Sequence, residues 1–133
     1  MLSALQTNSA SALILIVHGS SDDKWCDQFR NWTQQLKKEL GKDRVFLAFM
    51  EIADPSLEKV VKEEARKGKT EFQVLPIFMS SGGHVDKDIP KLIAEIRRSK
   101  PDLSITQLPP IGIHPEVRET MTRVAGAYLD PLQ

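Results

Sequence analysis

Residues 75–90 read LPIFMSSGGHVDKDIP, an apolar run that stops at Ser80 and then passes through two glycines to His84. The run is of the buried type, and a strand is predicted from Phe72 to Met79. A helix is predicted to begin near Ile89-Pro90, because proline is favoured in the first helical turn. This segment therefore predicts a strand, a Ser/Gly loop that carries one histidine, and a helix.

A second apolar run ends at a histidine in the same way. Residues 12–17 are apolar throughout, and His18, Gly19 and Ser20 follow directly. Two buried-type strands that each end at an imidazole beside Gly and Ser indicate a paired site.

Strands and helices alternate along the chain. Strands are predicted at residues 12–17, 45–50, 72–79 and 103–108, and Asp54-Pro55 reads as the start of the second helix. Apolar residues at helical spacing follow the first strand and the last one. The first of these helices carries Trp25, Phe29, Trp32, Leu36 and Leu40, and the last carries Val117, Met121, Val124 and Tyr128.

This alternation predicts an α/β fold, a small doubly wound three-layer sandwich with helices on both faces of a parallel sheet. The expected strand order is 2-1-3-4, which reverses between the first and third strands and so creates a crevice at the carboxyl edge. His18 and His84 follow those two strands, and Glu51 ends the neighbouring strand. The three side chains are therefore expected at one crevice.

Length and composition limit the classes of function. The 133 residues predict one domain over residues 12–133, preceded by a disordered tail of residues 1–11. Lys+Arg and Asp+Glu number 18 each, and no basic cluster interleaved with aromatics supports nucleic-acid binding. One cysteine, Cys26, excludes an internal disulfide and fits a reducing cytosol. No apolar run is long enough to cross a membrane, so we expect a cytoplasmic protein without a membrane partner.

The chemistry of the three side chains leaves two alternatives open. Neutral imidazole is a common ligand of divalent metals such as Co, Ni, Fe and Zn, so His18 and His84 suit metal handling. A His/Glu pair in one crevice equally suits acid–base work. Glu51 is the candidate proton acceptor, because the end of an apolar strand is expected to desolvate its carboxylate.

The loops beside the histidines offer groups for an anionic or flat ligand. Ser20, Ser80 and Ser81, with loop N–H groups, suit carboxylates or phosphates, and Gly82 and Gly83 allow a flat ligand to approach the backbone. Each feature also has a purely structural interpretation. The serines can cap helices, the Ser/Gly stretch can be a flexible connector, and Asp86 and Asp88 can cap the next helix. His114 precedes a helix-starting proline, so a capping role is its default interpretation.

At these residues the chain resembles the small class II tetrapyrrole chelatases, that is, sirohydrochlorin cobaltochelatase and its iron- and nickel-inserting relatives. Four pieces carry the resemblance, in family order, over about residues 13–129: VHGS at 17–20, FMEIADPSL at 49–57, PIFMSSGGHVDKDIP at 76–90, and PIGIHP at 110–115. VHGS alone is a weak match, whereas the four together are specific.

The resemblance implies a chelatase-like domain that inserts a divalent metal into sirohydrochlorin during cobalamin, sirohaem or related cofactor synthesis. The metal would be a substrate, Co²⁺ in the first place and Fe²⁺ or Ni²⁺ as alternatives, and no organic cofactor would be needed. His18 and His84 would hold the ion, and Glu51, or else a histidine, would accept the pyrrole protons. The short form implies a homodimer. The substrate carboxylates would meet donors near the crevice: Ser20, Ser80, Ser81, Gly82, Gly83 and Lys87.

Two rival classes remain for comparison. A non-catalytic metal carrier or sensor would need the histidines but neither Glu51 nor a ring-sized cleft. Hydrolysis or phosphoryl transfer is disfavoured, because the chain lacks a G-x-S-x-G elbow and has Val17 where an arginine would clamp phosphate. Dinucleotide binding is disfavoured as well, since no G-x-G-x-x-G follows the first strand.

Overall fold

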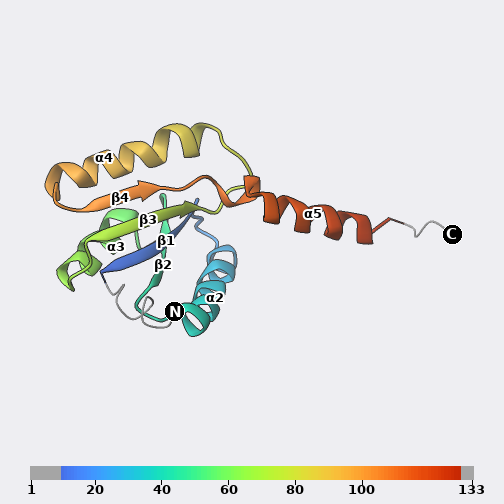
Figure 1. The fold of residues 1–133 in the computed structure, drawn as a ribbon, viewed down its shortest axis with the longest axis horizontal. Coiled ribbons are helices and arrows are strands. Elements are labelled where there is room, and N and C mark those ends of the chain that lie inside the picture. Colours follow the sequence, from blue (N-terminus) through green and yellow to red (C-terminus); the bar gives the residue numbers. More distant parts are fainter. Residues whose placement is uncertain (1–9, 130–133) are drawn as a thin grey trace.

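The computed structural model describes residues 10–129, apart from the side chain of His84. Strands and helices alternate as the sequence predicts (Figure 1). In chain order the elements are β1 (Ser11–Val17), α2 (Asp23–Leu40), β2 (Val45–Phe49), α3 (Leu57–Arg66), β3 (Glu71–Pro76), the π-helical turn η1 (His84–Asp88), α4 (Ile89–Ser99), β4 (Ser104–Gln107), the 3₁₀ turn η2 (Ile111–Ile113) and α5 (Pro115–Ala127).

The four strands form one parallel sheet in the order β2-β1-β3-β4, which confirms the predicted order. In the central strand β1, Ile14, Leu15 and Ile16 are at most 1% exposed. A strand covered on both faces has no polar side to alternate with, which explains its continuous apolar run. The reversal of direction falls between β1 and β3, where the crevice was expected.

Helices cover both faces of the sheet, so the predicted three layers are confirmed. On one face α3 and α4 supply Leu57, Val61, Ile89 and Ile93 to a core. On the other face α2 lies alone, and its aromatic residues and Leu36 pack against β1 and β2. Since α2 spans only the β2–β1 side, the β3–β4 side of this face has no helix of its own.

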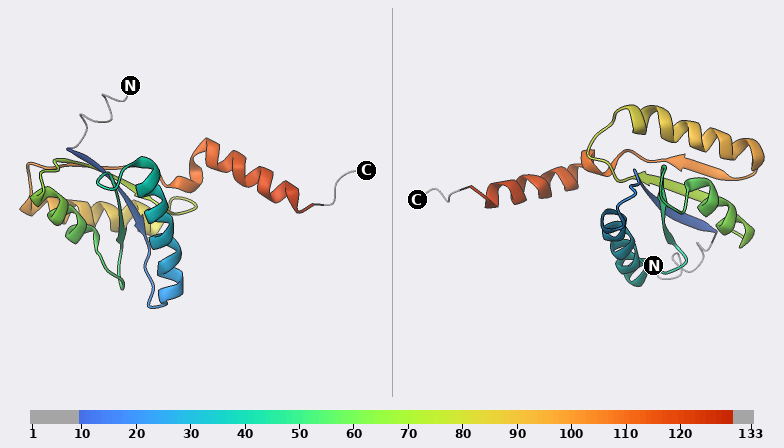
Figure 2. Two further views of the ribbon diagram at one scale, coloured as in Figure 1. Left: turned by 90° about the horizontal axis from the view of Figure 1, so that it is seen from below. Right: turned by 180° about the vertical axis from the view of Figure 1, so that it is seen from behind.

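The last helix does not join either layer. In Figures 1 and 2, α5 extends away from the sheet in every view, and none of its residues is buried. Its apolar positions stay open, with Val124 53% exposed and Tyr128, just beyond the helix, 86% exposed. Two contacts fix its direction at the base, where Arg118 Nε donates to the Gly112 carbonyl at 2.6 Å and His114 caps the helix. The predicted amphipathic helix is present, but it has no partner among the described residues.

Several predicted boundaries are wrong, among them the end predicted for β3 at residue 79, since that strand ends at Pro76. Asp54-Pro55 was predicted to start α3, whereas Ser56 is the N-cap and its hydroxyl accepts from the Lys59 N–H at 3.1 Å. The Asp54-Pro55 bond is cis, a geometry that residue types alone do not reveal. The predicted loop before α4 is also shorter than expected, because His84–Asp88 already forms a π-helical turn. Asp88 precedes α4 without a side-chain cap bond.

The predicted N-terminal tail, residues 1–11, lies outside the described residues as far as residue 9. Ser11 already pairs with Glu71 as the first residue of β1, so the strand starts one residue earlier than predicted. Over residues 10–129, none of the helices has the length and apolar character needed to cross a membrane.

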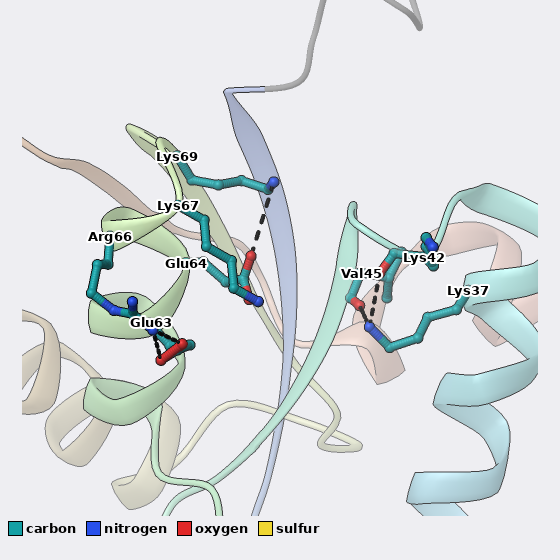
Figure 3. Close-up of polar contacts among 8 residues, drawn as sticks. All are labelled: Lys37, Lys42, Val45, Glu63, Glu64, Arg66, Lys67 and Lys69. Atoms are coloured by element: carbon teal, nitrogen blue, oxygen red, sulfur yellow. Dashed lines mark hydrogen bonds and ion pairs between the residues drawn. The ribbon is translucent and has the colours of Figure 1, made fainter.

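The outer edge of the sheet at β2 is covered by a lysine (Figure 3). The Lys37 ammonium donates to the carbonyls of Val45 at 2.6 Å and Lys42 at 3.0 Å, and burial lowers the pKa of Lys37 below its ordinary value. Figure 3 also shows Glu64 of α3, whose carboxylate lies 4.0 Å from the ammonium of the buried Lys69. A lysine that binds a carbonyl of an edge strand opposes the pairing of that part of β2 with another chain.

Candidate active site

Three loops meet at the carboxyl edge of the sheet. His18 follows β1 directly, Glu51 lies two residues beyond the end of β2, and the Ser/Gly loop follows β3. Since β1 pairs with β2 on one side and with β3 on the other, His18 stands between the other two exits. The structure thus places the predicted residues of β1 and β2 together at the carboxyl edge of the sheet, where the crevice was predicted.

His18 presents one nitrogen to Glu51. Its Nδ1 lies 3.2 Å from the carbonyl oxygen of Gly19. A carbonyl can only accept, so the tautomer with its proton on Nδ1 suits this contact, and that tautomer would present the Nε2 lone pair to a metal. Nε2 lies 3.6 Å from Glu51 Oε2, so this second ring nitrogen faces the carboxylate.

This separation is compatible with one ion between the two groups. Ligand atoms that each lie about 2.1 Å from a metal stand at most about 4.2 Å apart, and 3.6 Å falls within that limit. The His18 side chain is 36% exposed, so an ion can reach it from solvent. Imidazole and carboxylate together suit a borderline divalent metal, and they leave further coordination positions open.

The expected desolvation of Glu51 is wrong. Its side chain is 59% exposed, because β2 ends at Phe49 and Glu51 lies two residues beyond the buried strand. The backbone of Glu51 is nevertheless fixed, with its N–H donating to the His18 carbonyl at 3.2 Å. Glu51 therefore combines a fixed position beside His18 with direct contact to water.

Gly19 makes this arrangement sterically possible. Its φ is +107°, and a Cβ placed there would lie 2.0 Å from the Glu51 carbonyl oxygen. Only glycine adopts such a φ at low cost and leaves this space empty. The glycine after His18 thus brings the first and second strand exits into contact.

The Ser/Gly loop is open to solvent. Ser80, Ser81, Gly82 and Gly83 are all exposed, and a Cβ at either glycine would meet nothing within 4 Å. This openness agrees with the prediction that a flat ligand can approach the backbone here. His84 begins η1, but its side chain lies outside the described part of the structure, so its proposed pairing with His18 stays a prediction.

Ser20 and Lys87 differ in their surroundings. The Ser20 hydroxyl accepts from the Asp22 N–H at 2.9 Å, and Asp22, not a serine, caps α2. The Ser20 carbonyl also accepts from the buried thiol of Cys26 at 3.2 Å. Lys87 is exposed on η1. Ser20 therefore has a local structural role beside His18, whereas the Lys87 side chain is exposed to solvent.

His114 has the structural role that its sequence context favours. Its Nδ1 accepts from the Glu116 N–H at 3.2 Å and so caps α5, with Pro115 as the first helical residue. Across the side chains that the structure describes, no three His, Cys, Asp or Glu residues gather closely enough to enclose a metal ion.

Two apolar residues at the crevice carried no functional prediction. Ile52 and Met79 follow β2 and β3, and they are 68% and 65% exposed. Nothing in the residue types distinguishes them from core residues, because exposure is a property of the folded chain. The backbone of Met79 packs against Gly112. The Gly112 N–H donates to the Phe78 carbonyl at 2.9 Å, and a Cβ at Gly112 would lie 2.2 Å from the Met79 carbonyl oxygen.

Comparison with known proteins relates the chain to a family and to named chelatases. Residues 12–126 match the CbiX family. A protein from Sulfurisphaera tokodaii named sirohydrochlorin cobaltochelatase is 30% identical over 109 residues, which cover 82% of this chain and 86% of that protein. A protein from Priestia megaterium named sirohydrochlorin ferrochelatase is 24% identical over 102 residues, and the match spans 77% of this chain but only 38% of that longer protein.

A solved structure shares the fold. The crystal structure of a CbiX protein from Marinobacter aquaeolei VT8 superposes with a TM-score of 0.78 at 30% identity, covering 88% of this chain and 95% of that one. The superposition therefore spans most of both chains.

Proposed function

The chain belongs to the CbiX family of chelatases, enzymes that form nitrogen–metal bonds, and from this premise we propose that it inserts a divalent metal ion into sirohydrochlorin. The observation that carries the proposal is the juxtaposition of His18 and Glu51 at the carboxyl edge of the sheet, where His18 Nε2 and Glu51 Oε2 lie 3.6 Å apart. A metal ligand beside a proton acceptor is what metal insertion requires.

In the proposed mechanism, His18 and His84 hold the ion while leaving positions open for the ring nitrogens. Two N–H bonds of the ring break and the nitrogens take the metal, so two protons must leave. Glu51 receives them in turn. Its 59% exposure lets each proton pass on to water, so an exposed carboxylate suits repeated proton release better than a buried one.

The ring carries carboxylates, for which the rim of the crevice offers donors. We propose the hydroxyls of Ser20, Ser80 and Ser81, the N–H groups of Gly82 and Gly83, and the Lys87 ammonium as their partners. The exposed Ser/Gly loop supports this assignment, since none of its groups has to be uncovered first.

Co²⁺ is the first candidate for the inserted metal, and Fe²⁺ and Ni²⁺ are the alternatives. The relatives are named after both cobalt and iron chelation, and imidazole affinity follows the general divalent series, so supply often decides. We place the reaction in cobalamin or sirohaem synthesis in the cytoplasm. Anaerobic assays with the three metals side by side, following the loss of the metal-free absorbance spectrum, rank them directly.

The Glu51→Gln variant is expected to bind Co²⁺ but to lower kcat about 100-fold. The amide keeps the size of the side chain but cannot accept a proton, and general base catalysis contributes about 10²–10⁴-fold. The measurement is the rate of Co²⁺ insertion into sirohydrochlorin, alongside calorimetric titration with Co²⁺ alone.

Glu63→Gln serves as the matched control, because Glu63 pairs with Arg66 on α3 instead of lying at the crevice. Full activity in Glu51→Gln would remove Glu51 from the mechanism. Wild-type protein that binds Co²⁺ without accelerating insertion would favour the alternative, a metal carrier or sensor.

We further propose that the protein is a homodimer. The apolar stripe of α5 has no partner within the described chain, and a helix of this length is marginal without tertiary packing. At its base, a mostly apolar groove of about 640 Å³ is lined by residues that include Leu75, Leu108 and Ile113, on the sheet face that α2 leaves open. A second copy that covers both surfaces would also deepen the cleft for a wide ring.

Val124→Asp is therefore expected to convert a dimer of twice 15.0 kDa into a monomer, measured by light scattering after size-exclusion chromatography. A buried carboxylate is costly at an interface. Gly126→Asp is the control, because it adds the same charge on the opposite side of α5, where a Cβ would meet no atom within 4 Å. This variant should remain dimeric. A wild-type monomer at assay concentrations would overturn the proposal.

A further inference from the structure

Ile52 has the one strained backbone conformation among the non-glycine residues described. Its φ is +72°, and the Ala53 N–H donates to the Glu51 carbonyl at 2.8 Å across it. A hydrogen bond from residue i+2 to residue i around a positive φ is the classic γ-turn, which is rare and strained. A β-branched side chain at positive φ is a genuine outlier.

The surrounding backbone forces this turn. Met50 N–H donates to the Val17 carbonyl at 2.8 Å, and Phe49 N–H donates to the Pro55 carbonyl at 2.8 Å. The Glu51 carbonyl is further held against Gly19. The chain between β2 and α3 is thus fixed at both ends, and Ile52 has to take the tight turn.

Folding alone does not explain an isoleucine at this position. The side chain is 68% exposed, so it gains little from burial, while glycine or asparagine would adopt the same turn with less strain. Strained residues persist chiefly where function uses them. The side chain lies directly after Glu51, which faces His18.

A second exposed apolar side chain lies across the crevice. Met79 follows β3 and is 65% exposed, although its backbone is held against Gly112. The strands β2 and β3 flank β1, so their exits stand roughly 10 Å apart, two strand spacings, with His18 between them. Two exposed large apolar side chains on fixed backbone, at strand exits on either side of His18, offer apolar contacts to a flat ligand.

We infer that Ile52 and Met79 are positioning residues that support the flat apolar face of the tetrapyrrole on either side of His18. This inference rests on the proposed chelatase function. A ring that rests on both side chains presents its central nitrogens to an ion on His18, while its carboxylates extend to the rim. The two side chains therefore orient the ring and take no part in proton transfer.

The test separates ring binding from folding and from metal binding. Ile52→Gly is expected to raise the urea midpoint of unfolding, because the strain is relieved, and to raise KM for sirohydrochlorin about tenfold, which corresponds to about 1.4 kcal/mol. Calorimetric Co²⁺ affinity should stay unchanged. Ile52→Val keeps the branched side chain and should restore the wild-type KM, and Met79→Ala should raise KM without changing the midpoint.

Opposite changes in stability and ring affinity would not arise from a merely structural residue. A stabilised Ile52→Gly variant with unchanged KM would overturn the inference, and so would a destabilised variant that loses Co²⁺ and ring binding alike. Titration of metal-free sirohydrochlorin, followed by its own absorbance, gives a readout independent of turnover. If the protein has no chelatase activity but its affinity for the ring depends on Ile52, the proposed function is rejected and the inference is supported. If the wild type does not bind the ring at all, both are rejected.

Discussion

Replacement of His18 by asparagine is expected to lower kcat/KM for Co²⁺ insertion by about 100-fold or more. Asparagine places an amide near the position of Nδ1, so the contact with the Gly19 carbonyl can persist, but it has nothing at the position of Nε2. The variant therefore removes only the atom that faces Glu51 at 3.6 Å. Loss of a group that only orients a metal ligand already lowers metal affinity or activity by about 10–100-fold. Loss of the ligand itself should therefore lower activity further.

His114→Asn is the matched control for this prediction. Asparagine is a good N-cap, so the bond to the Glu116 N–H can be kept, and the same substitution is made away from the crevice. It should leave Co²⁺ affinity and turnover unchanged. His84→Asn should resemble His18→Asn, because His84 is the second proposed ligand. If His18→Asn and His84→Asn inserted Co²⁺ as fast as His114→Asn and the wild type, ligation of the metal by these two histidines would be ruled out.

The fold could be predicted from the sequence because its central strand β1 is buried on both faces. Runs such as residues 12–17 have no polar face, which identifies parallel strands and fixes the layers, and the 2-1-3-4 order then places His18 at the switch point. The site followed from the topology, since side chains that end neighbouring parallel strands must meet at one edge. Both steps depend on the pattern of apolar residues and on the order of strands and helices along the chain, and both can be read from the sequence.

The errors concern features that depend on the folded backbone. Glu51 was expected to be desolvated at a strand end, but β2 stops at Phe49 and Glu51 lies two residues beyond the buried strand. The strain at Ile52 arises from hydrogen bonds at Met50, Phe49 and Ala53, none of which a residue type reveals. The amphipathic pattern of α5 correctly predicted an apolar stripe, yet such a pattern does not say whether the covering surface belongs to the same chain.

The second large effect is expected at Gly19, where the two halves of the site touch. A Cβ at this position would lie 2.0 Å from the Glu51 carbonyl oxygen and 3.2 Å from its carbonyl carbon. Both are backbone atoms, so no flexible side chain can move aside. The Glu51 segment is itself fixed by its N–H bond to His18 and by the γ-turn, so relief requires the β1 and β2 exits to separate.

Gly19→Ala is accordingly expected to lower the free energy of unfolding by about 3 kcal/mol, from overpacking of about 1–3 kcal/mol and an unfavourable φ of about 1–2 kcal/mol. Urea denaturation should show a lower midpoint with an unchanged m-value. The surviving folded protein should also insert metal slowly, because separation of the exits moves Glu51 from His18. Gly83→Ala is the control, since a Cβ there meets nothing within 4 Å and stability should hold. A Gly19→Ala variant as stable and active as wild type would mean that the close contact between these exits is not needed for the site.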